Sequence, residues 1–246
     1  MTKPTLHCFR ASHFNEKAHW GLDWKGIDYD VVEHWPGPHA LAINKLTGQS
    51  ETPVLEWGSE VIAGSTEILH ALDRWVPERP LFPSAPEERQ RCAETIAWFD
   101  DELGPAVRLA LFHELLPDLD SVARIFVREP WGVRERLYRA ALPVVRSVMK
   151  RKMGIDEAAA EAGVMTTRAA LERVAQASNR GGYLVGDSFT AADLTAAALL
   201  SITVYPPGFH APLPDHLGPV MDDWRHAWRG NPGVRWMESI YAKHRS

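Results

Sequence analysis

Cysteine is almost absent from this chain: only Cys8 and Cys92 occur among 246 residues, far apart in the sequence. This scarcity excludes a disulfide framework and the closely spaced thiols of a structural zinc site. No run of about 18 or more uncharged apolar residues occurs either, so the usual sequence signature of a membrane-spanning helix is missing. The first ten residues lack the apolar core of a signal peptide. We therefore expect a cytoplasmic protein that does not enter a membrane.

Several catalytic signatures are missing as well. The sequence has no Walker motif, no GxGxxG, HExxH or GxSxG pattern and no internal repeat. The 11 histidines are scattered without a strong metal-site spacing, so no metal is predicted. A net charge of -5 argues against a nucleic-acid-binding surface. What is present is an apolar fraction of 45% with 10 tryptophans, which predicts a packed globular core that contains those tryptophans.

Residues 52–72 predict a strand, a tight turn, a second strand and a helix. A strand that begins at an X-Pro bond leaves the backbone of Thr52 free to meet a ligand, because Pro53 cannot donate to the sheet. Ser65 is a good N-cap, and the free N–H groups of Gly64 and Ser65 at the helix start suit a carboxylate. An ordinary hairpin followed by a simple helix cap explains the same residues. On the residues alone, both interpretations stay open.

The preceding residues complete a mixed sheet with helices. Residues 5–9 predict a strand in which Cys8 is buried and inert, and residues 12–26 predict a helix that Gly26 ends. A second strand at 28–33 and a short helix through Leu41 and Ile43 give the order β-α-β-α-β-β-α. Such a sheet places ligands at the carboxyl end of its first strand, where Ser12 precedes a helix. Ser12 is either an anion-binding hydroxyl or only the N-cap of that helix.

Three short segments carry a resemblance to a known family. Residues 52–55 (TPVL) and 65–68 (STEI) resemble the cis-proline strand and the helix start that hold glutathione in cytosolic glutathione transferases. Residues 12–19 (SHFNEKAH) resemble the run in bacterial, zeta-like and omega-like members whose first residue handles the glutathione sulfur. The sequence departs from the family pattern at Gly64, where an acid is usual, at Glu51, where a lysine is common, and at His19, where an arginine is usual.

The resemblance implies a fold, a site and a reaction. The fold is a thioredoxin-like domain followed by an all-helical domain. Ser12 is the implied catalytic residue, and Lys17 is a structural or supporting cation. The implied glutathione site contains Phe14, Asn15, His39, Gln49, Glu51, Thr52, Pro53, Gly64 and Ser65. The electrophile site is expected at Trp98, Arg108, Phe112 and His113, with Phe14 as a further wall. Glutathione is the implied co-substrate, and the implied electrophile is a small hydrophobic molecule. The resemblance also implies a role in detoxification and a homodimer.

The second half of the chain predicts helices only. A proline-rich segment at 77–88 predicts a linker between a domain at 1–76 and a domain at 89–246. A long run at 87–116 has an apolar stripe and a kink at Gly104 and Pro105, whereas Pro130 and Pro143 interrupt a second run at 121–153. A third helix is predicted at 167–177, ending before Asn179. Thr190 and Asp193 form a capping box that opens a buried helix at 191–204, and two helices at 217–228 and 232–241 close the chain. This box is also similar to the structural box of glutathione transferases.

The second run carries a local excess of positive charge. Its basic residues are Arg124, Arg128, Arg134, Arg136, Arg139, Arg146, Lys150, Arg151 and Lys152, with only Glu129 and Glu135 as acids. This face is either a docking site for an acidic ligand or a solvated face opposite a packing line. The predicted packing line is Leu137, Ala141, Val145 and Val148.

Two functions follow from these observations. The first is a glutathione transferase, or a related thiol-dependent isomerase or reductase, in which Ser12 activates the thiol. A serine in place of a cysteine disfavours mixed-disulfide chemistry. The second is a binding or structural protein of the same fold with little or no turnover, which the departures at Gly64 and Glu51 favour.

Overall fold

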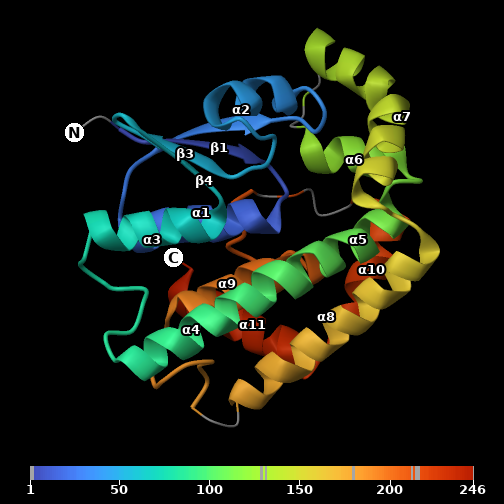
Figure 1. Cartoon of the computed structure of the whole chain (residues 1–246). Helices are drawn as coiled ribbons and strands as arrows, with labels where there is room; N and C mark the ends of the chain where they lie inside the picture. The colour runs from blue at the N-terminus through green and yellow to red at the C-terminus, as the bar shows by residue number, and fades with distance from the viewer. Residues whose placement is uncertain are drawn as a thin grey trace.

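The computed structural model describes residues 3–127, 130, 132–178, 181–211, 213 and 217–245. The chain forms a thioredoxin-like part with a four-stranded mixed sheet, followed by a large helical part (Figure 1). No helix in the described ranges is both long enough and apolar enough to cross a membrane. The described tryptophans are buried or pack against the core, as predicted.

The thioredoxin-like part has the predicted element order. Its elements are β1 (Thr5–Phe9), α1 (His13–Trp24), β2 (Asp30–His34), α2 (His39–Thr47), β3 (Val54–Trp57), β4 (Glu60–Ala63) and α3 (Ser65–Trp75). The strand order is β2-β1-β3-β4, with β1 and β2 parallel and the other pairs antiparallel. Helix α2 lies on one side of the sheet, and α1 and α3 lie on the other (Figure 1).

Helix α1 is buried on almost every side because it lies between α3 and the helical part. Every residue from Asn15 to Leu22 is buried, although the helix carries Glu16, Lys17 and His19. Gly21 permits the close approach of α3, since a Cβ at that position would lie 2.3 Å from the Leu69 Cδ2 atom. A buried helix with ionised residues needs a partner for each charge. The charged partners of Glu16 and Lys17 come from the helical part.

A segment without helix or strand joins the two parts. Lys25 fixes it: its Nζ donates to the backbone oxygens of Val76, Glu78 and Arg79 and pairs with Asp73 at 2.7 Å. Helix α4 then begins at Pro86, inside the residues that the sequence assigned to a linker.

The helical part contains ten helical segments among its described residues. They are α4 (Pro86–Trp98), the π-helix η1 (Phe99–Leu103), α5 (Gly104–Leu115), α6 (Leu119–Phe126), α7 (Val133–Met153), α8 (Glu157–Ser178), α9 (Ala191–Leu200), the 3-10 helix η2 (Ser201–Thr203), α10 (Pro219–Trp228) and α11 (Pro232–His244). The stripe predicted along the first run is buried, and η1 lies just before the expected kink at Gly104. Helix α9 is buried all round.

The capping box at the start of α9 is confirmed. Thr190 accepts a hydrogen bond from the Ala192 N–H, and the Asp193 carboxylate accepts from the N–H groups of Thr190 and Leu184 at 2.9 and 2.7 Å. Burial raises the pKa of Asp193 to about 6, against these hydrogen bonds. Asp193 therefore orders the start of α9 at the centre of the helical part, as predicted.

Three helix predictions are wrong in extent. Pro143 lies inside α7 and does not interrupt it; the residue is exposed to solvent, and its oxygen accepts from Ser147 Oγ at 2.9 Å. Helix α8 begins at Glu157, ten residues before the predicted start, because Asp156 caps it through the Ala159 N–H and alanine and glutamate propagate it. Helix α9 ends at Leu200 and tightens into η2.

The predicted packing line on α7 is wrong except at Val145, which packs against the core. Leu137 and Val148 are 67% and 38% exposed, and Ala141 faces solvent. The buried residues of α7 are Tyr138 and Leu142, because the helix packs onto the loop before α2, where the Tyr138 hydroxyl donates to the Pro36 oxygen at 2.8 Å. Arg128 and Glu129 of the basic run, and Asn179, lie outside the described residues.

Candidate functional site

Ser12 lies at the junction where β1 ends and α1 begins. Its backbone is extended, its oxygen accepts a hydrogen bond from the Asn15 N–H at 3.5 Å, and its side chain is half-buried. The N-cap interpretation of Ser12 is therefore correct as far as the helix is concerned. A hydroxyl oxygen that accepts from the backbone still has its own hydrogen to donate to a ligand. The two interpretations of Ser12 are compatible.

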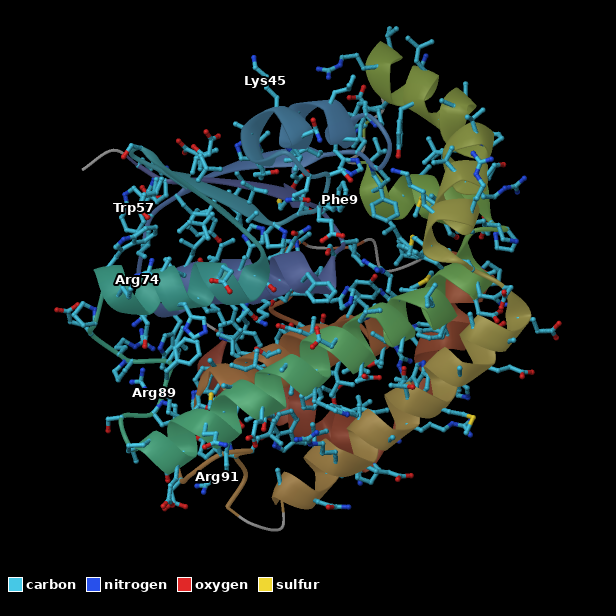
Figure 2. The ribbon with its side chains drawn as sticks, in the orientation of Figure 1. Phe9, Lys45, Trp57, Arg74, Arg89 and Arg91 are labelled. Atoms are coloured by element: carbon cyan, nitrogen blue, oxygen red, sulfur yellow. The ribbon has the colours of Figure 1, made fainter. Side chains whose placement is uncertain are left out.

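Asn15 joins this helix start to the segment that precedes β3. Its Nδ2 donates to the Phe9 oxygen and to the Thr52 Oγ1, both at 3.3 Å. The Thr52–Pro53 peptide is cis, and the sheet pairing of β3 begins only at Val54. Phe9 marks the carboxyl end of β1 in Figure 2. The backbone of Thr52 thus lies beyond the ladder and close to the start of α1.

The start of α3 lies beside the same segment. The Gly64 N–H donates to the Pro53 oxygen at 3.0 Å, and Ser65 follows as the first residue of α3. Gly64 has a φ of 98°, a conformation that favours glycine, although a Cβ there would meet nothing within 4 Å. Backbone conformation therefore accounts for the missing acid at position 64. The polar residues Ser12, Thr52 and Ser65 come from three segments and lie at the same end of the strands of the sheet.

Two predicted glutathione residues make internal contacts. The Gln49 amide is bound to the backbone of Glu51: its Nε2 donates to the Glu51 oxygen at 3.1 Å, and its Oε1 accepts from the Glu51 N–H. His39 begins α2, where its Nδ1 accepts from the Gly37 N–H at 3.0 Å. The His39 ring lies edge-on to Phe9, with centroids 4.6 Å apart. His39 is thus next to the end of β1, and a ligand at Gln49 would have to compete with its own backbone.

The beginning of α5 closes the junction from the other side. The His13 Nε2 donates to the Gly104 oxygen at 2.9 Å, and a Cβ at Gly104 would lie 2.4 Å from the Phe14 Cζ. His13 is buried, and that burial, together with the charge of Arg108, lowers its pKa to about 3. The imidazole beside Ser12 is therefore neutral at physiological pH.

The residues predicted for the electrophile site divide into two groups. Gly104, Arg108 and Phe112 recur at intervals of four residues and so share the face of α5 that contacts α1. Trp98 instead has the Arg173 guanidinium of α8 at 4.8 Å from its ring, and the His113 Nδ1 lies 3.2 Å from the Glu114 carboxylate. Arg108 and Phe112 therefore lie on the face of α5 that contacts the start of α1, whereas these contacts of Trp98 and His113 lie within the helical part. Within the described part of the chain, no cluster of three potential metal ligands occurs.

Comparison with known families agrees with this geometry. Residues 6–80 match the family model for the N-terminal domain of glutathione S-transferase. The first domain is a glutathione S-transferase N-terminal domain. No curated protein matches the sequence.

The glutathione S-transferase fold extends over both parts of the chain. A glutathione S-transferase from Rhodospirillum rubrum is 23% identical, with 95% of this chain and 91% of that chain covered and a TM-score of 0.60. The theta class enzyme from Xanthomonas axonopodis pv. citri, solved with glutathione bound, is 20% identical, with 96% of each chain covered and a TM-score of 0.58. The beta-etherase LigF from Sphingobium sp. strain SYK-6 is 17% identical, with 97% and 99% covered and a TM-score of 0.62. At these identities the likeness concerns the fold alone.

Two buried charge clusters support the glutathione S-transferase domain; the sequence analysis gave Lys17 of the first a supporting role and missed the second. In the first, the Lys17 Nζ lies 2.8 Å from each Asp100 carboxylate oxygen and also donates to Thr66 Oγ1. Burial lowers the pKa of Lys17, and the Asp100 charge opposes that effect. Lys17 therefore joins α1, α3 and η1, which agrees with a structural cation.

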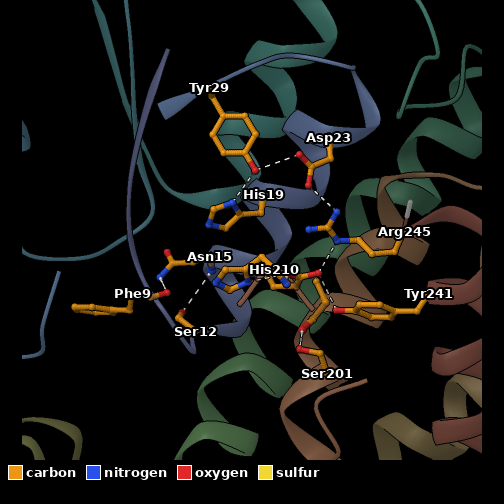
Figure 3. A network of polar contacts seen from close by, with 12 residues as sticks. Phe9, Ser12, Asn15, His19, Asp23, Tyr29, Ser201, His210, Tyr241 and Arg245 are labelled. Carbon is orange, nitrogen blue, oxygen red and sulfur yellow. Dashed lines mark hydrogen bonds and ion pairs between the residues drawn. The ribbon is translucent and has the colours of Figure 1, made fainter. Parts of the chain in front are cut away.

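The second cluster surrounds Glu16, one turn after Ser12; Figure 3 labels its partners His210, Tyr241 and Arg245. The Glu16 carboxylate accepts from the His210 Nδ1, the Tyr241 hydroxyl and the Arg245 Nε at 2.7, 3.1 and 2.8 Å. Arg245 also pairs with Asp23 at 2.6 Å. Burial opposes ionisation of Glu16, but His210 and Arg245 outweigh it and lower the pKa. No sequence pattern singled out Glu16, an acid in the first turn of α1.

Proposed function

We propose that this protein is a glutathione-dependent transferase in which the Ser12 hydroxyl stabilises the glutathione thiolate. The observation that carries the proposal is the convergence of Ser12, the Thr52 backbone and the start of α3 at one sheet edge. The family of the first domain supports glutathione as the ligand. The theta class structure is described with glutathione bound, which supports the same choice.

Each of these three positions suits one part of glutathione, which is a tripeptide. The Thr52 backbone is free to pair with the cysteinyl backbone, and Pro53 holds the turn into β3. The N–H groups of Gly64 and Ser65, with the Ser65 hydroxyl, suit the γ-glutamyl carboxylate at a helix N-terminus. We assign Phe14, Asn15, His39, Gln49 and Glu51 to the surrounding wall, as the resemblance implies.

The energy required of Ser12 is modest. A thiol has a pKa near 8.5, and lowering it by about two units requires roughly 2.7 kcal/mol of preferential stabilisation of the thiolate. One hydrogen bond to a charged acceptor contributes about 1.5–3 kcal/mol, and a helix N-terminus contributes about 0.3–1 kcal/mol. The hydroxyl and the α1 dipole together meet this requirement. The thiolate then attacks a small electrophile held between Ser12 and α5.

The competing proposal is a ligand-binding protein of the same fold with little turnover. Three observations support it: Gln49 hydrogen-bonds to its own backbone neighbour, Glu51 stands where a lysine is common, and Ser12 is the N-cap of α1. It predicts that substitution of Ser12 changes stability only. A homodimer, a cytoplasmic location and a role in detoxification stay predictions that follow from the resemblance and the composition.

One experiment separates the two proposals. Isothermal titration with millimolar glutathione should release heat, and Ser12→Ala should lower conjugation of a model aryl halide by about 10-fold or more, the scale for losing one donor to an anion. Ser12→Thr keeps a hydroxyl and should retain activity. Because Ser12→Ala also removes a helix cap worth about 1 kcal/mol, thermal unfolding is measured in parallel. Unchanged turnover in Ser12→Ala would remove Ser12 from the mechanism, and absence of binding heat would contradict the transferase.

A further inference from the structure

Arg108 is a cation on α5 for which the described residues provide no ion-pair partner. Its side chain is half-buried, and its Nε is fully enclosed without a hydrogen-bond partner. In the described part of the chain, the guanidinium makes no hydrogen bond and no ion pair. Burial lowers the pKa of Arg108 from its usual value, and the attraction of Glu51 opposes the effect. Removing a charge from water without a partner is costly.

Three other enclosed cations in the described part of the chain are paired with carboxylates. Lys17 contacts Asp100, Lys25 contacts Asp73, and Arg245 contacts Glu16 and Asp23. Each of these pairs fixes one part of the fold against another. Arg108 has no such acidic partner among the described residues. This difference indicates that the partner of Arg108 comes from outside the chain.

The position of Arg108 relates it to the candidate site. It lies one turn after Gly104, on the face of α5 that contacts His13 and Phe14, directly after Ser12. The electrostatic effects of Arg108 on His13 and of Glu51 on Arg108 agree with a position near the start of α1 and near the segment before β3. His13 adds no positive charge there because burial keeps it neutral.

We propose that Arg108 binds a carboxylate on the second substrate, so that the transferase acts on anionic electrophiles. This inference rests on the proposed function of the site. A planar guanidinium donates two parallel hydrogen bonds to a carboxylate, which fixes orientation as well as affinity. The γ-glutamyl carboxylate of glutathione is assigned to Ser65, so the open guanidinium on the α5 side suits the other substrate. The glycine carboxylate of glutathione would bind a guanidinium in the same way. The experiment below distinguishes it from a carboxylate on the second substrate.

Arg108 takes no part in the bond changes. In the substitution of an aryl chloride, the thiol proton is released to water, the sulfur forms a bond to the aryl carbon, and chloride leaves with the electron pair of the broken bond. The guanidinium contributes by holding the ring so that this carbon faces the thiolate. A carboxylate on the ring, away from the reacting carbon, is therefore the feature that Arg108 selects.

The test compares 4-chloro-3-nitrobenzoate with the corresponding benzamide, which differs in charge and little in shape. The wild type should have a kcat/KM about 10- to 100-fold higher for the benzoate, the scale of one charged hydrogen-bonded pair. Arg108→Gln should remove this preference, because its kcat/KM should fall about 10- to 100-fold for the benzoate and much less for the benzamide, with no rise in the KM for glutathione. Arg91→Gln, on the outer surface of α4 (Figure 2), is the matched control and should behave as wild type.

Two outcomes would overturn the proposal. Equal kcat/KM values for both compounds in the wild type would show that no carboxylate is selected. A raised KM for glutathione in Arg108→Gln, equal for both electrophiles, would assign Arg108 to the glycine carboxylate. Binding of the benzoate to Ser12→Ala, followed by tryptophan fluorescence, makes the test independent of turnover. Loss of that binding in the Ser12→Ala, Arg108→Gln double variant supports the subsite even if the proposed transferase activity fails.

Discussion

His13, at the junction between the two domains, makes the stability of the fold sensitive to acid. Its folded pKa is about 3, whereas the unfolded chain would bind a proton near the ordinary value of 6.5. Below pH 6.5 the unfolded state therefore holds more protons than the folded state, so stability falls as the pH falls toward 3. Each pH unit in this window costs roughly 1.4 kcal/mol, which amounts to about 2 kcal/mol at pH 5.

His13→Gln tests this linkage because glutamine keeps an N–H donor for the Gly104 oxygen and cannot titrate. We expect the decrease in unfolding free energy between pH 7 and pH 5 to be smaller in the variant by about 2 kcal/mol. Urea unfolding at the two pH values measures it. The same decrease in both proteins would mean that His13 becomes protonated in the folded state at pH 5.

Single residues were predictable where local chemistry fixes them. Ser12, Thr52 and Ser65 were identified because a helix cap and an X-Pro strand start have short-range signatures, and the structure brings them to one edge. The contact of Glu16 with Arg245 was not predictable, because no local pattern relates residues 229 positions apart. Arg108 was expected in the electrophile site from its place on a helix. That it forms no ion pair among the described residues is visible only in the three-dimensional structure.

At the scale of elements, the order of the first domain and the starts of α1 and α9 followed from caps and periodicity. The failures lie in α7 and α8. Helix α7 has apolar residues on more than one face, so periodicity alone could not select the face that packs. Contact with the loop before α2 decides it, and that contact is between distant parts of the chain.

Two neighbouring apolar residues of α7 test which face is buried. Leu142 is 1% exposed and Val144 is 67% exposed. Leu142→Ala should lower the unfolding free energy by about 2–5 kcal/mol, because it leaves a cavity in the core. Val144→Ala is the matched control and should change stability by less than about 0.5 kcal/mol. Equal losses in chemical unfolding would contradict the observed orientation of α7.

At the scale of the whole molecule, the Glu16 cluster joins the last helical turn to the helix that begins at Ser12. Arg245 is held by Glu16 and Asp23, both in α1, and Tyr241 in α11 donates to the same Glu16 carboxylate. Because the folded pKa of Glu16 is lowered, its ionised form stabilises the fold above the unfolded value of 4.5. That contribution is lost as the pH falls from this value through the folded pKa.

A double-mutant cycle measures how strongly this cluster couples the two ends of the chain. At pH 7, Glu16→Gln and Arg245→Met should each lower the unfolding free energy by about 3 kcal/mol, because each leaves a buried charge with fewer partners. The double variant should lose less than the sum by at least about 1 kcal/mol, since residues in one network are not additive. Strictly additive losses would mean that Asp23 alone satisfies Arg245, and that the chain end is not held through Glu16.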